Sequence, residues 1–495
     1  MEERRRLARL GLPTEQEALA NELDVDGLQG WGRLYDRISS ELRIPVMEHG
    51  EIVQKSPGQV TWDGPERTVR ENNFRAADRA WRSIADTCAD ALNHIAGSRL
   101  TRYGRLPVHD HLDLPLALAR MSRETLQTMW DTIAAQKTFL LPYLEAKARW
   151  LGVPRLAWFD LSAPIPAGDP RQRQDRVPYE QACRIIIDTF SLFSEELGTF
   201  AERALREGWV EAENRPGKRQ GGFCAGFPMH RQSRIFMTYT DSLESLSVLA
   251  HELGHAYHGH VLRDLPVFLQ QYPMNLAETA STFAEAVVGD VLLQQTTDPA
   301  RRLQWLDKRL ADAVSFLMNI HCRFLFEDEF YRRRRERELT AAELDDLMLA
   351  AQKTAYCNAL CEDGWNPRFW ASKLHFYITE IPFYNFPYTF GFLLSCGLCQ
   401  IARRSPEGFA EAYRAFLCRT GRAMTEQVVK ESFGYDLREP HFWNLALDRI
   451  RPWVDEFLQL SGGGPAPTYG SSDDSRKPPG TGAGAGAEAD GTSPK

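Results

Sequence analysis

Residues 251–258 read HELGHAYH, in which two histidines stand four positions apart and a glutamate follows the first. On a helix of about 3.6 residues per turn, His251 and His255 lie on one face, one turn apart, so both imidazoles can reach a single cation. Glu252 lies about 100° around the helix from His251, where it can lean over such a cation and hold a water molecule. Two histidine ligands with a glutamate base are typical of hydrolytic zinc sites. A helix that carries two histidines without a metal is the alternative.

Two features of the neighbouring sequence favour the metal site. The apolar run LSVLA at 246–250 predicts that the helix begins in the protein interior, where histidine and glutamate side chains need partners. The helical stretch MNLAETASTFAEAVVGD at 274–290 supplies Glu278, 23 positions beyond His255, which leaves enough chain for a loop and a returning antiparallel helix. Two histidines and Glu278 would leave the fourth zinc position open for water, as hydrolysis requires.

Other polar residues near the motif leave alternatives open. Glu285 lies on the same helical face as Glu278 and is equally compatible with orienting a ligand histidine and with being an ordinary surface carboxylate. His258 is close to the face of the ligands, and we interpret it as a packed histidine or one that supports a ligand. His260 falls on the opposite face. HDH at 109–111 lies in a loop-like stretch without a third ligand nearby, so a second metal there is not expected.

The stretch LHFYITEIPFYNFPYTFG at 374–391 offers hydrogen-bond donors for the oxyanion that forms when water attacks a peptide carbonyl. These donors are His375, Tyr377, Tyr384 and Tyr388, and tyrosine hydroxyls stay protonated near neutral pH. An aromatic-rich core segment is the alternative. Composition alone favours that alternative, because aromatic side chains dominate protein cores.

A mostly helical pattern surrounds these motifs. Apolar residues at spacings of three and four predict long helices at 70–97, 123–152 and 179–208, and Pro142 is expected to kink or break the second of them. The pattern is helical again from about 274 to 460. We therefore expect a mainly α-helical fold.

Strand-like sequence is short and clustered just before the histidine helix. RIFMTY at 234–239 is rich in aromatic and branched residues, and GGFCAGF at 221–227 is a plausible partner strand or glycine-rich loop. These segments predict a small β-sheet next to the metal-binding helix. If 234–239 is an exposed edge, it could hold an extended peptide by main-chain hydrogen bonds and place the cleaved bond at the metal.

Three regions are expected along the 495 residues: an N-terminal helical lobe at 1–150, a catalytic region at 151–460, and a disordered tail at 461–495. The tail is almost entirely Gly, Pro, Ser, Ala and charged residues, which bury too little apolar area to offset the entropy of the chain.

The net charge and the cysteines of the chain indicate which binding partners and which cellular location to expect. The formal net charge is −8, and the run RRRRERE at 332–338 lies in a mixed-charge helical stretch, so neither nucleic acid nor an anionic membrane is an expected partner. The N-terminus is too polar for a secretory signal, and no run of roughly 18 apolar residues predicts a membrane span. Nine scattered cysteines, including Cys396 and Cys399 in an apolar run, fit reduced thiols and core positions. We therefore expect a cytoplasmic protein.

Several ordered segments together resemble the oligoendopeptidase F branch of the thimet-oligopeptidase-like zinc metallopeptidases. Beside HELGHAYH, the resemblance rests on RIFMTYTDSLESLSVLA at 234–250, AETASTFAE at 277–285 and HFYITEIPFYNFPYTFG at 375–391. FDLSAPI at 159–165 and GKRQGGFCAGFP at 217–228 also match in order and kind. The resemblance covers residues 150–460 well and the first 150 residues loosely. The glycine-rich form of the 375–391 segment that thimet-type relatives have is absent here.

The resemblance implies one zinc ion per chain, held by His251, His255 and Glu278, with Glu252 as general base and proton shuttle. It also implies that His375 and Tyr388 donate hydrogen bonds to the transition state and that Tyr384 lines the cleft. The fold it implies is a helical ellipsoid with a deep central channel, which admits peptides but excludes folded proteins.

These observations predict a zinc-dependent endopeptidase that cleaves short, unfolded peptides internally. A metallocarboxypeptidase with the same histidine–glutamate motif is one alternative. A zinc-containing protein that binds peptides without cleaving them is another.

Overall fold

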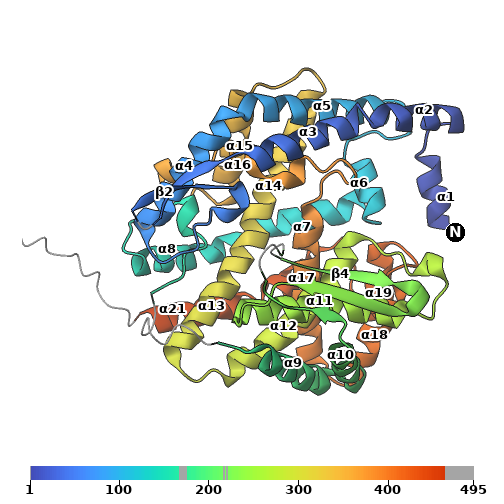
Figure 1. Ribbon diagram of the computed structural model, residues 1–495. Helices are drawn as coiled ribbons and strands as arrows, with labels where there is room; N and C mark the ends of the chain where they lie inside the picture. The colour runs from blue at the N-terminus through green and yellow to red at the C-terminus, as the bar shows by residue number, and fades with distance from the viewer. Residues whose placement is uncertain (1, 49, 167–175, 216–217, 219–220, 463–495) are drawn as a thin grey trace, which may run out of the picture.

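The structure is a computed structural model and describes residues 2–48, 50–166, 176–215, 218 and 221–462. The described chain is mainly α-helical with two small β-sheets, which confirms the predicted fold class (Figure 1). The helices up to residue 206 are α1 (Glu2–Arg9), α2 (Thr14–Asp24), α3 (Leu28–Glu41), α4 (Arg67–Ser83), α5 (Ala85–Tyr103), α6 (Asp113–Leu118), α7 (Arg123–Gln136), α8 (Leu141–Trp150), α9 (Tyr179–Phe193) and α10 (Glu195–Arg206). The later helices are α11 (Leu243–Leu262), α12 (Met274–Gln295), α13 (Pro299–Val314), α14 (Ile320–Arg334), α15 (Ala341–Ala355), α16 (Phe369–Ser372), α17 (Phe386–Arg404), α18 (Phe409–Arg419), α19 (Thr425–Phe433), α20 (Pro440–Leu447) and α21 (Arg451–Ser461).

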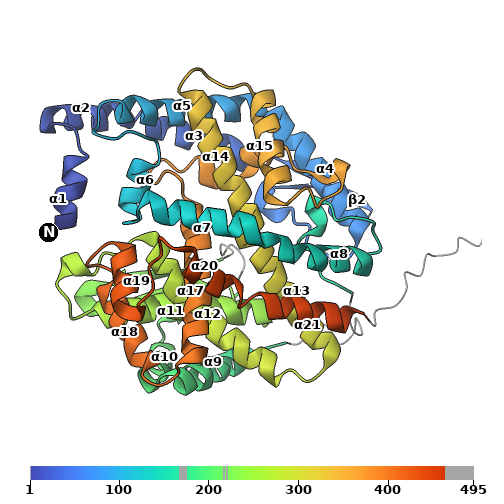
Figure 2. The ribbon, with the colours of Figure 1, turned by 180° about the vertical axis from the view of Figure 1, so that it is seen from behind.

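The helices form two halves that lie one above the other in both views (Figures 1 and 2). The upper half holds α2–α5 together with α14–α16, and α5 packs against α3, α14 and α15. The lower half holds α9–α12 and α17–α20. α13 continues through a π-helical turn at Ser315–Asn319 into α14, so this run of helix connects the two halves. Among the described helices, none is long and apolar enough to cross a membrane.

The division into an N-terminal lobe at 1–150 and a catalytic region at 151–460 stays a prediction. The tail predicted at 461–495 lies, from residue 463 on, outside the described residues.

The long helices predicted from the apolar stripe are each interrupted. The segment at 70–97 is divided between α4 and α5, where Ile84 has φ −119° and ψ 9°. The segment at 123–152 breaks between α7 and α8, with Pro142 in the first turn of α8, as expected. The segment at 179–208 breaks at Ser194, whose hydroxyl accepts a hydrogen bond from the Leu197 N–H and starts α10. At Ser194, a hydrogen bond from the serine side chain therefore starts a new helix within a continuous apolar stripe.

Two small sheets accompany the helices. β1 (Ile44–Glu48) and β2 (Glu51–Lys55) form an antiparallel hairpin. β3 (Val210–Glu211), β4 (Gly222–Phe227) and β5 (Gln232–Met237) form a second sheet in the order β3-β5-β4, with β5 parallel to β3 and antiparallel to β4. β4 and β5 pack against α11, so the predicted sheet next to the histidine helix is confirmed.

The strand at 234–239 was expected to offer an exposed edge, and this prediction is wrong. Most of that segment belongs to β5, which is the central strand and pairs on both sides. β4 is an edge strand, because within the described chain it pairs only with β5. The order of strands depends on contacts between distant segments, which the alternation of residues within one strand does not encode.

Three helices pack closely around the predicted metal ligands: α11, α12 and α17. Glycine allows both contacts. A Cβ atom on Gly254 of α11 would lie 2.8 Å from the carbonyl oxygen of Ala280 on α12. A Cβ atom on Gly391 of α17 would lie 2.8 Å from the Cβ of Glu278. Any larger residue at these positions would push the helices apart and move the side chains they carry.

Candidate metal centre

The three predicted metal ligands converge at the crossing of α11 and α12. One ligand atom from each of His251, His255 and Glu278 lies within 4.8 Å of the others. The Nε2 atom of His251 lies 3.6 Å from Oε2 of Glu278, and the Nε2 atom of His255 lies 4.0 Å from Oε1. These distances are too long for direct hydrogen bonds. They approach the spacing of about 3.3 Å between ligands that each lie about 2 Å from one tetrahedral ion.

The chemistry of this donor set fits zinc. Two imidazoles and one carboxylate are ligands that zinc accepts, and three protein ligands leave one position open. Burial lowers the pKa of His255 to about 3, with a further contribution from His251, so this imidazole is neutral as a metal ligand must be. Burial raises the pKa of Glu278, which indicates that its charge lacks a strong partner within the protein.

Glu285 contacts a ligand directly. Its Oε1 atom lies 2.6 Å from Nδ1 of His251, and the hydroxyl of Ser247 donates to its Oε2 atom at 2.9 Å. Burial opposes a charge on His251, but the Glu285 carboxylate more than compensates and raises the pKa of His251 to about 9. The contact fixes the ring so that Nε2 points toward Glu278. Of the two interpretations of Glu285, the structure therefore favours the orienting carboxylate over the ordinary surface residue.

Glu252, next to the ligand His251, carries a buried carboxylate with one oxygen that is unpartnered within the described chain. Its side chain is 5% exposed, and its Oε2 atom has no hydrogen-bond partner among the described residues. Burial raises the pKa of Glu252 to about 7, which suits a group that accepts and then returns a proton near neutral pH. A Cβ atom on Gly222 of β4 would lie 3.0 Å from its Oε1 atom, so the start of β4 passes directly beside this carboxylate.

The segment before and within α17 brings its aromatic residues together. The ring of His375 lies 5.1 Å from that of Tyr384 and 6.1 Å from that of Tyr388, between ring centroids. The Nδ1 atom of His375 lies 2.7 Å from Oδ1 of Asn385, which leaves Nε2 as the other polar atom of the ring. Burial raises the pKa of Tyr388, with a further contribution from the charge of Glu278, so this phenol is protonated and near the ligand helix.

Tyr377 differs from the other tyrosines of this segment. Its side chain is 2% exposed, and its ring stacks on that of Tyr35 from α3 at 3.5 Å between centroids. Tyr377 therefore packs in the upper half, where the core interpretation of this segment holds.

The remaining histidines of the motif have protein partners. His258 is fully buried, lies 2.8 Å from the hydroxyl of Thr420 and stacks on Tyr272, which agrees with a packed histidine. His260 lies 3.2 Å from the guanidinium of Arg203.

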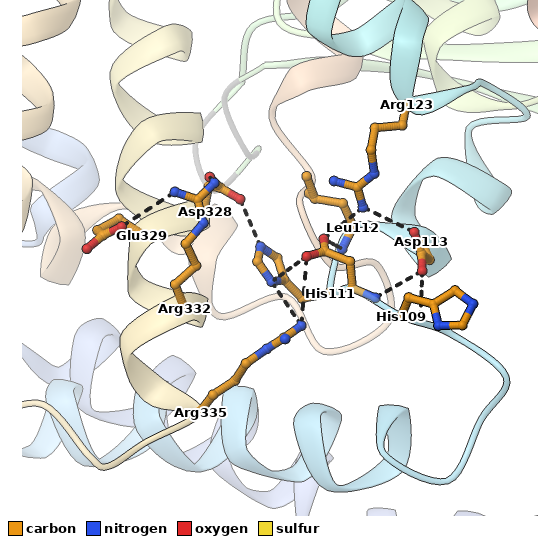
Figure 3. Close-up of polar contacts among 10 residues, drawn as sticks. His109, His111, Leu112, Asp113, Arg123, Asp328, Glu329, Arg332 and Arg335 are labelled. Atoms are coloured by element: carbon orange, nitrogen blue, oxygen red, sulfur yellow. Dashed lines mark hydrogen bonds and ion pairs between the residues drawn. The ribbon is translucent and has the colours of Figure 1, made fainter.

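The HDH segment at 109–111 is held by carboxylates and arginines (Figure 3). The Nε2 atom of the buried His111 lies 2.8 Å from Oδ1 of Asp328 on α14. Arg335 lies 3.5 Å from Nδ1 of the same ring, and Asp110 pairs with Arg123 at 2.8 Å. Both ring nitrogens of His111 therefore face protein groups, and we call this set the His111 cluster.

Three features of the site were not predicted from the sequence. They are the hydrogen bond from the Ser247 hydroxyl to Glu285, the hydrogen bond between His375 and the side-chain oxygen of Asn385, and the position of β4 beside Glu252. Ser247 lies four residues before His251 on the same helix, so helical spacing could have indicated it. The other two contacts depend on how separate segments pack.

Comparisons with known proteins identify the family of the chain. The sequence model of Peptidase family M3 matches residues 61–448. Group B oligopeptidase PepB of Streptococcus agalactiae is 24% identical over 81% of this chain and 66% of its own length. Oligopeptidase PepF of Bacillus subtilis is 23% identical over 80% of this chain and 58% of its own length. The chain thus spans about three fifths to two thirds of the length of these relatives.

Solved structures share the fold. The crystal structure of oligoendopeptidase-F from Enterococcus faecium superposes with a TM-score of 0.69 at 21% identity, over 91% of this chain and 75% of that one. A crystal structure from Chlamydophila abortus gives a TM-score of 0.79 at 21% identity, with the same coverage.

Proposed function

The chain belongs to peptidase family M3, and from this premise we propose that it is a zinc-dependent endopeptidase that hydrolyses short, unfolded peptides. The observation that carries the proposal is the convergence of His251, His255 and Glu278 beside a buried carboxylate, Glu252, with a free oxygen. The names of the relatives, which are oligopeptidases and oligoendopeptidases, support peptides as the substrate class.

His251, His255 and Glu278 would hold the metal. A zinc ion bound there supplies a Lewis acid and lowers the pKa of a coordinated water to about 7. Glu285 keeps His251 in the tautomer and orientation that present Nε2, because its carboxylate takes the hydrogen bond of Nδ1.

Glu252 would move the proton. Its Oε2 atom accepts a proton from the attacking water and returns it to the nitrogen of the leaving amine. Burial in the protein alone raises the pKa of Glu252 to about 7, which favours its protonated form more than water does.

Tyr388 would donate a hydrogen bond to the oxyanion, and Tyr384 would line the cleft. His375 would donate from Nε2 only as a protonated ring, because in its neutral form the proton lies on Nδ1, which faces Oδ1 of Asn385. The close packing of Gly391 against Glu278 supports this assignment, since it holds the first turns of α17 against the ligand helix. Donors fixed by such packing need no rearrangement when the charge develops.

The peptide would lie along β4 rather than β5. The outer edge of β4 pairs with no other strand in the described chain, and Gly222 at its start lies beside Glu252. An extended peptide that pairs with this edge by main-chain hydrogen bonds would place one of its carbonyls near the ligands. The deep channel and the cytoplasmic location remain predictions of the resemblance and of the free cysteines.

Metal analysis and product analysis test this function together. We expect about one zinc per chain, internal cleavage of a mid-length unstructured peptide as seen by mass spectrometry, loss of cleavage with a chelator, and recovery with zinc. Stepwise release of single C-terminal residues would instead indicate a metallocarboxypeptidase. Zinc and peptide binding without any cleavage would indicate a peptide-binding protein.

A further inference from the structure

A cavity of about 260 Å³ lies beneath the far end of the β4–β5 hairpin. Its walls come from four segments: Trp209 before β3, the hairpin end with Gly226 and Phe227, the second half of α11, and the connection from α11 to α12 with Val267 and Tyr272. None of the predicted metal ligands or catalytic residues lines it.

The mouth of this cavity is unusually apolar for a protein surface. Phe227 is 45% exposed and Val267 is 64% exposed. Met229, 92% exposed, lies between two lining residues of the hairpin, and Phe268, 57% exposed, follows Val267. Exposed large apolar side chains gathered around a cavity are typical of a binding surface, and methionine adapts its shape to different partners.

The two arginines that line the cavity are both paired with Asp264, which lies outside its lining. Arg231 lies 3.0 Å from Asp264, and Arg263 lies 3.4 Å from the same carboxylate while donating to the His260 carbonyl at 2.8 Å. These arginines therefore need no anionic ligand, and what the cavity offers to a partner is mainly apolar surface.

β4 connects this cavity to the metal centre. Alternate residues of a strand face the same side. Gly222 faces α11, because its Cβ would approach Glu252, so Cys224 and Gly226 face α11 as well. Four residues of strand span about 13 Å. A peptide that runs along β4 with its cleaved bond beside Glu252 would thus bring a residue three to five positions away to the cavity.

Tyr272 forms part of the cavity wall on the side of α11. Its ring stacks on that of His258, at 3.9 Å between ring centroids. The connection from α11 to α12 is therefore packed against α11 beside the cavity.

We propose that this cavity is a subsite for a large apolar side chain, located three to five residues from the cleaved bond of the substrate. The proposal rests on the peptidase function proposed above. It implies that the protein selects peptides by a residue distant from the reaction, and that peptides too short to reach the cavity are poor substrates.

Peptide series test the subsite. Peptides that differ only at the residues three to five positions from the cut would carry either leucine, phenylalanine or alanine there. Because the cavity buries most of such a side chain, we expect kcat/KM to be roughly 10- to 100-fold higher with the apolar residue at one of these positions.

Two variants test whether the preference for an apolar substrate residue arises at this cavity. Gly226→Leu fills the cavity from the strand, and no atom lies within 4 Å of the Cβ it adds. Val267→Lys places a charge at the exposed mouth, where it leaves the core unaffected. In both we expect the ratio of kcat/KM between the apolar and alanine peptides to fall to near one. Leu192→Lys makes the same exchange at an exposed residue of α9, away from the cavity, and should keep the wild-type ratio.

The outcomes separate this proposal from the function on which it rests. Cleavage by the wild type without preference at these positions, or a preference that survives both Gly226→Leu and Val267→Lys, would overturn the subsite and leave the peptidase intact. No cleavage of any peptide by the zinc-loaded wild type would overturn both.

Discussion

Two places in this molecule set a buried or half-buried histidine against carboxylates, and they differ in what balances the charges. In the metal centre, the Nε2 atoms of His251 and His255 face the carboxylate of Glu278 at 3.6 Å and 4.0 Å, too far for hydrogen bonds. In the His111 cluster, His111 is hydrogen-bonded to Asp328 at 2.8 Å, and Arg332 pairs with the same carboxylate at 2.5 Å (Figure 3).

The source of positive charge explains the difference. Around the His111 cluster, the carboxylates are paired with three arginines: Arg332 of α14, Arg335 just after it, and Arg123 of α7. Around the metal centre, Glu252 and Glu278 have raised pKa values because burial is opposed mainly by one histidine. A divalent cation at His251, His255 and Glu278 would supply there what arginines supply in the cluster. In this molecule the two sites therefore differ in whether arginine accompanies the histidine and the carboxylate.

Glu252→Gln should produce the largest effect and would separate catalysis from metal binding. The amide cannot accept the proton, so we expect kcat to fall roughly 10²- to 10⁴-fold while the zinc content stays near one per chain. Cleavage of a quenched fluorescent peptide and metal analysis measure the two quantities. Glu244→Gln, at an exposed carboxylate of the same helix, is the control and should keep wild-type kcat. A wild-type rate in Glu252→Gln would refute its role as the base.

Glu285→Gln tests whether a carboxylate outside the ligand set belongs to the metal centre. The amide keeps the shape but removes the charge that holds the Nδ1 proton of His251, so zinc affinity should fall roughly 10- to 100-fold. Competition with a chelator of known affinity measures it. Asp290→Asn is the matched control, because Asp290 is on the same helix but pairs with Arg309 and Arg449. Equal zinc affinity in wild type and Glu285→Gln would make Glu285 a structural residue only.

Asp328→Ala addresses the other side of the comparison. It removes the acceptor of a buried histidine, and we expect the free energy of unfolding to fall by about 1–3 kcal/mol, because the His111 ring stays buried without that partner. Zinc affinity should not change. Urea unfolding of the zinc-loaded protein measures the loss. Glu329→Ala, at the next residue of α14, removes only surface ion pairs and should cost less than about 1 kcal/mol. A loss of zinc in Asp328→Ala would show that the two regions are coupled.

The parts of this comparison that depend on local geometry were predictable from the sequence. The spacing of His251 and His255 fixes their shared helical face, and the helical pattern at 274–290 was enough to name Glu278. What could not be predicted is which residues meet across the fold. The edge strand is β4 and not β5 because strand order follows from tertiary packing. The absence of a nearby third ligand argued against a metal at His111, but its partner Asp328 lies 217 positions away, so no local pattern could name it.

The sequence also contained a helix-start signal that the prediction from apolar spacing did not use. Ser194 followed by two glutamates, Glu195 and Glu196, is a typical helix start, and α10 begins there although the apolar stripe continues from α9. A capping side chain accepts hydrogen bonds from the free N–H groups of a new helix. This stabilisation sets the boundary between α9 and α10, because the apolar stripe alone fits one long helix as well as two.

Glu327 shows a third way to neutralise a buried carboxyl group. The change in stability that we predict for it is the smallest of our predictions. It precedes Asp328 in α14 and is 3% exposed, and its Oε1 atom accepts a hydrogen bond from the Phe383 N–H at 3.2 Å. Burial raises its pKa to about 8, although Arg99 partly opposes this. Near neutral pH a proton therefore neutralises the carboxyl group of Glu327. Arginine neutralises that of Asp328, and a metal cation would neutralise that of Glu278.

The pH dependence of stability shows whether that proton is held. Between the unfolded pKa of about 4.3 and the folded value of about 8, the folded chain binds more protons at Glu327 than the unfolded chain. This contribution to stability is complete below the unfolded pKa and is lost as pH rises through the folded one. Glu327→Gln, which is neutral at every pH, should therefore lose less stability than wild type between pH 5 and 8 in urea unfolding. Glu329→Gln at the exposed neighbour should follow the wild-type slope, and a Glu327→Gln profile parallel to wild type would mean that Glu327 is charged in the folded protein.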